Sequence, residues 1–139
     1  MKKDFKILFG IVTLLLFVIV GYLIMYEYPK FQKKARESEV KLALQAFKTA
    51  EDSYFDEWKK YSSSRVDIGF NAEGSRLRHK IYLRVEELSP SELELLGENL
   101  PIVQDSFYKV IARSEGETYA TYWSFDNTGK LEKIIDVPK

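Results

Sequence analysis

The most prominent hydrophobic pattern is an uncharged apolar run from Ile7 to Tyr26. It is 20 residues long, and only two glycines and one threonine interrupt its large apolar side chains. A helix of that length rises about 30 Å, which matches the hydrocarbon core of a bilayer. The pattern therefore predicts a transmembrane helix at 7–26, preceded by a short basic segment at 1–6.

A cleavable secretory signal is the alternative interpretation, because Lys2, Lys3 and Lys6 form a basic start before the run. The run is longer than the ~7 to 15 residues of a signal core. It ends in Tyr, Glu, Tyr and Pro at 26–29, where cleavage needs small residues. We therefore expect a retained membrane anchor.

The pattern changes to a one-sided helical stripe at 30–61, a stretch without glycine or proline. This spacing predicts a helix that packs one face against its own domain. A coiled-coil seam is the alternative, but the carboxylate of Glu51 interrupts one of its two rows. The residues that we expect to pack on a sheet are Val40, Leu44, Phe47, Tyr54 and Trp58.

Apolar and polar residues alternate in the second half of the chain, which is typical of half-buried strands. The predicted strands are 77–85, 108–113, 119–125 and 131–137. Between the first two, Ser89-Pro90-Ser91-Glu92 has the capping pattern of a short helix that ends near Gly97. Short turns favour antiparallel neighbours. The predicted fold is α+β, with the long helix packed on an antiparallel four-stranded sheet at 77–137.

Composition restricts the chemistry that such a domain can perform. The formal net charge is zero, with 21 basic and 21 acidic residues, so no broad positive field favours nucleic acid. The chain has no cysteine and one histidine, which excludes disulfides, thiolate nucleophiles and cysteine-based metal sites. We therefore expect no cofactor, no metal, no small-molecule substrate and no enzymatic activity.

Three local groups of residues could carry chemistry, and the pattern around each favours a structural role. His79 lies on the apolar face of a predicted strand, where a satisfied structural histidine is the expectation. The basic group of Arg76, Arg78, Lys80 and Arg84 is interpreted as an exposed sheet face. We expect a solvated surface for the acidic group, which comprises Glu86, Glu87, Glu92, Glu94 and Glu98.

The order of elements, with a basic start, an apolar span, an amphipathic helix and an antiparallel sheet, resembles a bacterial type IV pilin. Pilins carry a glycine and, eight residues later, a proline, followed by an aromatic residue and glutamine. Here Gly21, Pro29, Phe31 and Gln32 stand at those spacings. The stretches 38–44, 49–55 and 68–70 also look like the corresponding helix and loop of pilins from predatory and gliding bacteria.

The resemblance implies a structural subunit in pilus or pseudopilus assembly, adhesion or motility. Its N-terminus would be cytoplasmic, its helix in the inner membrane, and its domain at 27–139 periplasmic or in a surface filament. Its partners would be the lipid bilayer and other pilin-like or envelope subunits. Gly21 and Pro29 would then mark the region that loosens on assembly, and both residues are expected to favour helix bending.

The chain also departs from the pilin pattern. Aligning it on Gly21 and Pro29 places Ile7 at the cleavage glycine and Val12 at the glutamate that pairs with a neighbouring subunit's amine. A minor pilin or an unprocessed pilin-derived subunit is therefore predicted. Basic residues flank the span on both sides, so charge alone leaves topology open. The alternative function is a single-span inner-membrane protein whose periplasmic domain binds a protein or senses a ligand.

Overall fold

The computed structural model describes residues 2–70, 78–116 and 119–139. They form two compact units, Met1–Ala35 and Arg36–Lys139. Two sequence predictions, the start of the first strand at Leu77 and the place of Arg76 in the basic group, lie outside the described residues.

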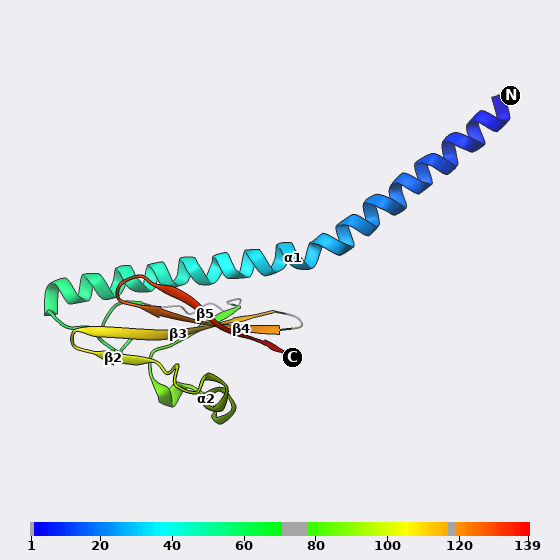
Figure 1. Ribbon diagram of the computed structural model, residues 1–139. Helices are drawn as coiled ribbons and strands as arrows, with labels where there is room; N and C mark the ends of the chain where they lie inside the picture. Colours follow the sequence, from blue (N-terminus) through cyan, green and yellow to red (C-terminus); the bar gives the residue numbers. More distant parts are fainter. Residues whose placement is uncertain (1, 71–77, 117–118) are drawn as a thin grey trace. The chain divides into compact units, whose positions relative to one another are not determined.

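Helix α1 comprises Lys2–Trp58 and carries both the apolar run and the amphipathic stripe (Figure 1). In the described chain it is the one helix long and apolar enough to cross a membrane, and its most apolar window has no residue buried inside the protein. The backbone stays helical through Gly21 and Pro29. Because proline has no N–H, it leaves the carbonyl four residues earlier without its helical donor. Bending at these two residues stays a prediction.

The predicted end of the helix at residue 61 is wrong by three residues, because α1 ends at Trp58. Lys59 adopts a left-handed conformation with φ 56°, and its N–H donates to the carbonyl of Phe55 at 2.7 Å. This is a common way for a helix to end. The chain turns back, and the N–H of Tyr61 donates to the carbonyl of Asp105 at 3.1 Å.

The sheet of the second unit has five antiparallel strands in the described residues. They are β1 (His79–Tyr82), β2 (Ile102–Gln104), β3 (Phe107–Glu115), β4 (Tyr119–Asp126) and β5 (Leu131–Pro138). The order of four of them is β1-β3-β4-β5. The fifth, β2, pairs with the first residues of β3, along the same edge of β3 that pairs with β1 farther on. The α+β fold is confirmed, with one more strand than predicted. Three residues are too few to show the alternation by which strands are recognised.

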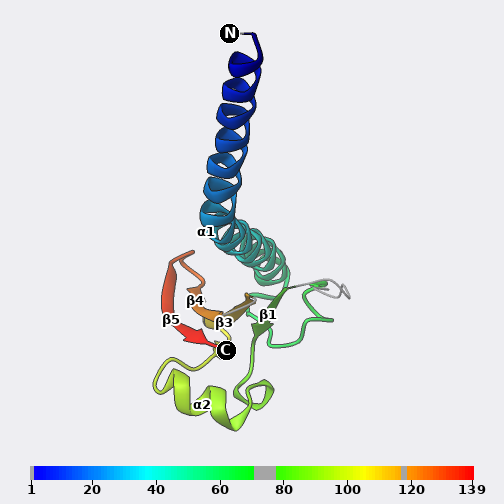
Figure 2. The same cartoon turned by 90° about the vertical axis from the view of Figure 1, so that its right-hand side faces the viewer.

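Both faces of the sheet are covered, whereas the sequence predicted one covered face. In Figure 2, α1 and the short helix α2 (Pro90–Leu96) lie on opposite sides of the strands. The first face packs Tyr108, Val110, Ala112, Trp123 and Phe125 against α1. The second face buries Tyr82, Ile111, Ala120 and Tyr122 with Leu88 and Leu96. Tyr82, on the face of β1 that the sequence assigned to solvent with the basic group, is therefore a core residue.

Candidate functional site

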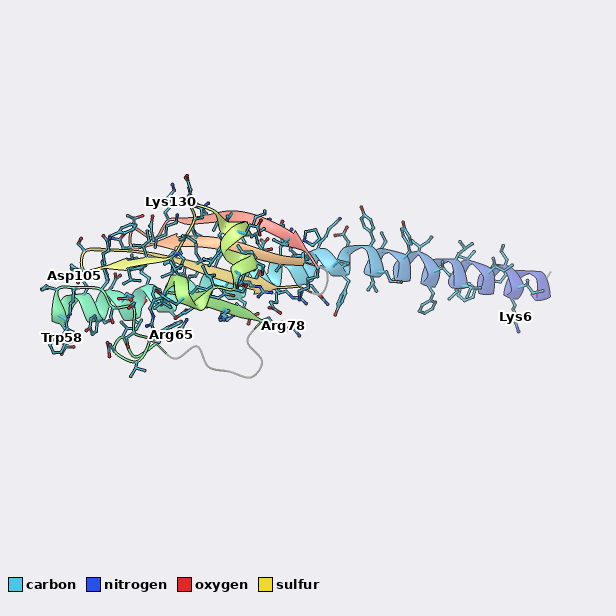
Figure 3. All side chains as sticks on the ribbon, turned by 90° about the horizontal axis from the view of Figure 1, so that it is seen from below. Lys6, Trp58, Arg65, Arg78, Asp105 and Lys130 are labelled. Carbon is cyan, nitrogen blue, oxygen red and sulfur yellow. The ribbon has the colours of Figure 1, made fainter. Side chains whose placement is uncertain are left out.

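The first candidate surface is the apolar part of α1, which belongs to the first unit. In the view of Figure 3, side chains project from both sides of this part of the helix. Its large apolar side chains between Phe5 and Phe31 are 49% to 80% exposed. The hydroxyl of Thr13 donates to the carbonyl of Phe9 at 2.9 Å, so this polar group is satisfied within the helix. A helix that is apolar all round needs an apolar environment, which lipid or neighbouring helices supply.

Gly21 lies on this same surface. A Cβ placed there would meet no heavy atom within 4 Å, and the same holds for Gly10. No contact within the chain therefore requires glycine at these two positions. Small residues on a membrane helix allow another helix to approach closely.

The second candidate surface is the face of α1 that packs on the sheet. Val40, Leu44 and Phe47 are at most 1% exposed and belong to one core cluster with the strands. The ring of Phe47 meets that of Tyr108 edge-on, with centroids 5.5 Å apart. Tyr54 is partly buried against the same cluster. These four residues hold the last turns of α1 on the sheet.

The expectation for Trp58 is wrong, because this side chain is 58% exposed. Trp58 is the last residue of α1, and the chain reverses directly after it. Tyr61 packs at this end of the core instead: its ring stacks on Phe55 at 4.6 Å and meets Tyr108 edge-on at 4.9 Å. The core position that helical spacing assigned to Trp58 is therefore filled from the segment that follows the helix.

Glu51 is a buried carboxyl between α1 and the sheet. It is fully buried, and its Oε2 accepts a hydrogen bond from the N–H of Ser62 at 3.2 Å. Its Oε1 has no hydrogen-bond partner among the described residues. Burial, with a smaller contribution from the charge of Asp52, raises its pKa to about 7 against the opposing effect of the hydrogen bond from Ser62. In the sequence, Glu51 was interpreted only as the residue that interrupts one row of a coiled-coil seam. A carboxyl in an otherwise apolar row is also the signal of a buried polar group, and that signal was missed.

Glu92 forms a second buried site, under the opposite face of the sheet. Its Oε1 accepts from the hydroxyls of Tyr82 at 2.7 Å and Tyr122 at 3.0 Å, and from Nη1 of Arg113 at 3.2 Å. Its Oε2 accepts from the N–H of Ser89 at 2.9 Å. Burial raises the pKa, but the hydrogen bonds from Ser89, Tyr82 and Tyr122 outweigh it and lower the pKa to about 2.

Glu92 corrects one prediction and confirms another. It was expected on a solvated acidic surface, yet it is 8% exposed. The predicted capping box is confirmed, because Ser89 and Glu92 exchange their side-chain and backbone hydrogen bonds at the start of α2. The carboxyl thus caps α2 and fastens it to β1, β3 and β4 at the same time.

The remaining candidate groups are spread over the second unit. His79 lies on β1 with its side chain 5% exposed, and its Nδ1 is 3.4 Å from Oε1 of Glu39. Lys80 lies over the ring of Tyr82 at 4.7 Å, and Arg84 approaches Glu87 at 3.8 Å. Among the described residues, no three histidine or acidic side chains gather where they could hold a metal ion.

No protein-family model matches the chain. Among curated proteins, it aligns with the type IV major pilin protein PilA of Myxococcus xanthus, strain DK1622, with 29% identity over 114 residues. The chain is similar to a type IV pilin. The alignment covers 76% of this chain and 52% of that pilin, so the chain spans about half the length of the curated relative.

The similarity agrees with the architecture, in which a long N-terminal apolar helix is joined to an antiparallel sheet. The one long apolar helix and the similarity to a pilin are together consistent with a single-pass membrane protein.

Proposed function

We propose that this protein is a pilin-like structural subunit. The segment 7–26 anchors it in the inner membrane, the basic start stays in the cytoplasm, and the domain lies in the periplasm or in a surface filament. Its partners are the bilayer and other pilin-like subunits. The observation that carries the proposal is the similarity to a type IV pilin over 76% of the chain.

The exposed apolar part of α1 supports this role. Its large apolar side chains between Phe5 and Phe31 are 49% to 80% exposed. A membrane subunit that enters a filament exchanges lipid for neighbouring apolar helices, so one surface serves both environments. Gly10 and Gly21, with open space around them, are the positions where such a neighbour approaches most closely.

The finer role that we propose is that of a minor pilin or an unprocessed pilin-derived subunit, acting in assembly, adhesion or motility. Val12 stands where a pilin carries the glutamate that pairs with a neighbour's amine. A buried amine or carboxylate without its partner is costly in an apolar environment. A subunit that lacks this pair docks through apolar packing alone, which suits a position outside the repeating body of a filament.

Shear fractionation tests the proposal. Cells are sheared, and the extracellular filament fraction and the detergent-extracted membrane fraction are probed for the full chain. A pilin-like subunit appears in both fractions. A single-span adaptor or sensor stays in the membrane fraction, and that result would contradict a place in a surface filament.

Two variants make the fractionation specific. Ile19→Asp places a charge in the middle of the apolar run and should remove the chain from both fractions. Val66→Asp is the matched control, because Val66 is 88% exposed in the segment that follows α1. It adds the same charge outside the span, so its distribution should match that of the unaltered chain.

A further inference from the structure

The C-terminal end of the apolar run carries a regular ladder of side chains. Tyr22, Tyr26, Lys30 and Lys34 recur every four residues, so each lies next to the following one along the surface of α1. The rings of Tyr22 and Tyr26 lie 6.5 Å apart and only 13° from parallel. The ammonium of Lys30 lies 4.4 Å from the ring centroid of Tyr26. These four residues are called the headgroup ladder below.

All four residues of the ladder face solvent within the first unit. Tyr22 is 69% exposed, Tyr26 is 60% exposed, and the side chain of Lys30 is 59% exposed. Lys34 is also exposed. Tyr28 and Phe31 add further exposed aromatic rings at the same level of the helix. Aromatic rings concentrate at membrane–water interfaces because one end is apolar and the other polar.

The spacing along the ladder fits the thickness of the headgroup layer. Four residues separate Tyr26 from Lys30, which is about 6 Å of helix. The polar region on each side of a bilayer is roughly 5 to 7 Å thick. When the run 7–26 occupies the hydrocarbon core of the bilayer, Tyr26 lies at the edge of that core. The ammonium of Lys30 lies 4.4 Å from the centroid of that ring, which places it where the hydrocarbon meets the headgroups.

The charge at this level is positive. Between residues 27 and 35, three lysines stand against Glu27 as the one acidic residue. Glu27 accepts from Lys30 at 2.9 Å, and the formal charge of the segment 27–35 is positive by two. Basic residues next to a span attract anionic lipid surfaces within a Debye length.

From this geometry we propose that the headgroup ladder binds anionic phospholipid. Lys30 and Lys34 contact the lipid phosphates, and Tyr22 and Tyr26 sit where the hydrocarbon meets the headgroups. The ladder thereby fixes the depth of the anchor. It also gives a role to the lysines that follow the span, which charge-based topology does not explain. The inference rests on the proposed membrane insertion of 7–26.

Energy transfer between the protein and labelled lipids tests the ladder. The chain has no cysteine, so Met25→Cys, at a position 80% exposed, gives one thiol for a fluorescent donor beside the ladder. The full chain is reconstituted into vesicles of equal phosphatidylcholine and phosphatidylglycerol. A trace of acyl-labelled acceptor of either headgroup is added. Transfer to the phosphatidylglycerol acceptor should exceed transfer to the phosphatidylcholine acceptor by about twofold or more, and salt should reduce the ratio.

Charge variants of the labelled chain test whether Lys30 and Lys34 cause the preference for the phosphatidylglycerol acceptor. Lys30→Gln with Lys34→Gln should bring the ratio close to one, whereas Lys30→Arg with Lys34→Arg should keep it. Lys41→Gln with Lys60→Gln is the matched control, because it removes two exposed charges from the second unit and should leave the ratio unchanged.

The possible failures are distinguishable. Retention of the chain in floated vesicles after an alkaline wash reports insertion. A chain that inserts but shows a ratio of one, or a ratio that the glutamine pair does not change, overturns the ladder and leaves the proposed anchor standing. A chain that the wash removes overturns the anchor and the ladder together.

Discussion

At the scale of single residues, two buried glutamates show how surroundings decide what a carboxyl does. Glu51 lies in the apolar contact between α1 and the sheet with one backbone donor. Glu92 is also buried, but it accepts from two tyrosine hydroxyls, an arginine and the cap of α2. The first environment disfavours the ionised form and the second favours it. The two residues therefore make the domain respond to pH in opposite directions.

The first prediction concerns Glu51. Its pKa in the folded chain is about 7, above its usual value of 4.5, so the folded state holds this proton more tightly than the unfolded state. The resulting stability is fully present below pH 4.5 and is lost as the pH rises through 7. The loss is roughly 3 kcal/mol. The glutamine of Glu51→Gln cannot ionise, so the variant should not show this loss at high pH. It should therefore be more stable than the unaltered chain at pH 8.

Urea unfolding of the full chain in detergent, followed by tryptophan fluorescence across this pH range, measures the effect. Asp56→Asn, at an exposed position on the same helix, is the control. A Glu51→Gln chain with the same pH slope as the unaltered chain would show that the carboxyl is not buried in solution.

The second prediction has the opposite sign. The pKa of Glu92 is lowered from 4.5 to about 2, so its stabilising effect is present above pH 4.5 and is lost as the pH falls toward 2. Glu92→Gln leaves Arg113 without its buried carboxylate and should cost about 2 to 4 kcal/mol at pH 7. The difference should shrink in acid. Glu94→Gln, at an exposed position on α2, should change little, and an equal loss in both variants would contradict the role of Glu92.

At the scale of elements, periodicity predicts a packed face well and a helix end poorly. The stripe identified Val40, Leu44 and Phe47, because these positions recur at helical spacing well inside α1. It failed at Trp58, because helical spacing does not say where a helix stops. Lys59 takes a left-handed conformation that glycine usually adopts, so the sequence carries no stop signal there.

Truncation of the two aromatic residues separates these outcomes. Phe47→Ala should cost about 3 to 5 kcal/mol, the usual loss for a buried aromatic side chain. Trp58→Ala should cost less than about 1 kcal/mol, because most of that side chain already meets solvent. The free energies of unfolding of the two variants in detergent give the comparison. Similar losses at both positions would mean that Trp58 is covered in solution.

The short elements illustrate a second limit of sequence patterns. The helix α2 was predictable because Ser89, Pro90 and Glu92 form a local capping signal. That signal does not reveal what the helix covers. The hydroxyls of Tyr82 and Tyr122 donate hydrogen bonds to Glu92 on α2. The second of these bonds joins residues 30 positions apart in the sequence. Such contacts follow from tertiary packing, so the covered second face and the burial of Glu92 could not be predicted from local spacing.

At the scale of the whole molecule, the order of elements was more informative than any single motif. The basic start, apolar run, stripe and strands together suggested a pilin-like protein, and the similarity to a type IV pilin supports it. The headgroup ladder was not apparent in the sequence. In the sequence, the lysines after Tyr26 indicated only that charge does not decide the topology. The contact between Lys30 and the Tyr26 ring is what suggested their role at the headgroups.

The proposed function requires the second unit to lie outside the cytoplasm, and thiol labelling tests this requirement directly. Val66→Cys introduces the only thiol of the chain at a position that is 88% exposed. A membrane-impermeant thiol reagent should label it in cells whose outer membrane alone is permeabilised. Labelling that appears only after the inner membrane is lysed would place the domain in the cytoplasm and contradict the pilin-like role.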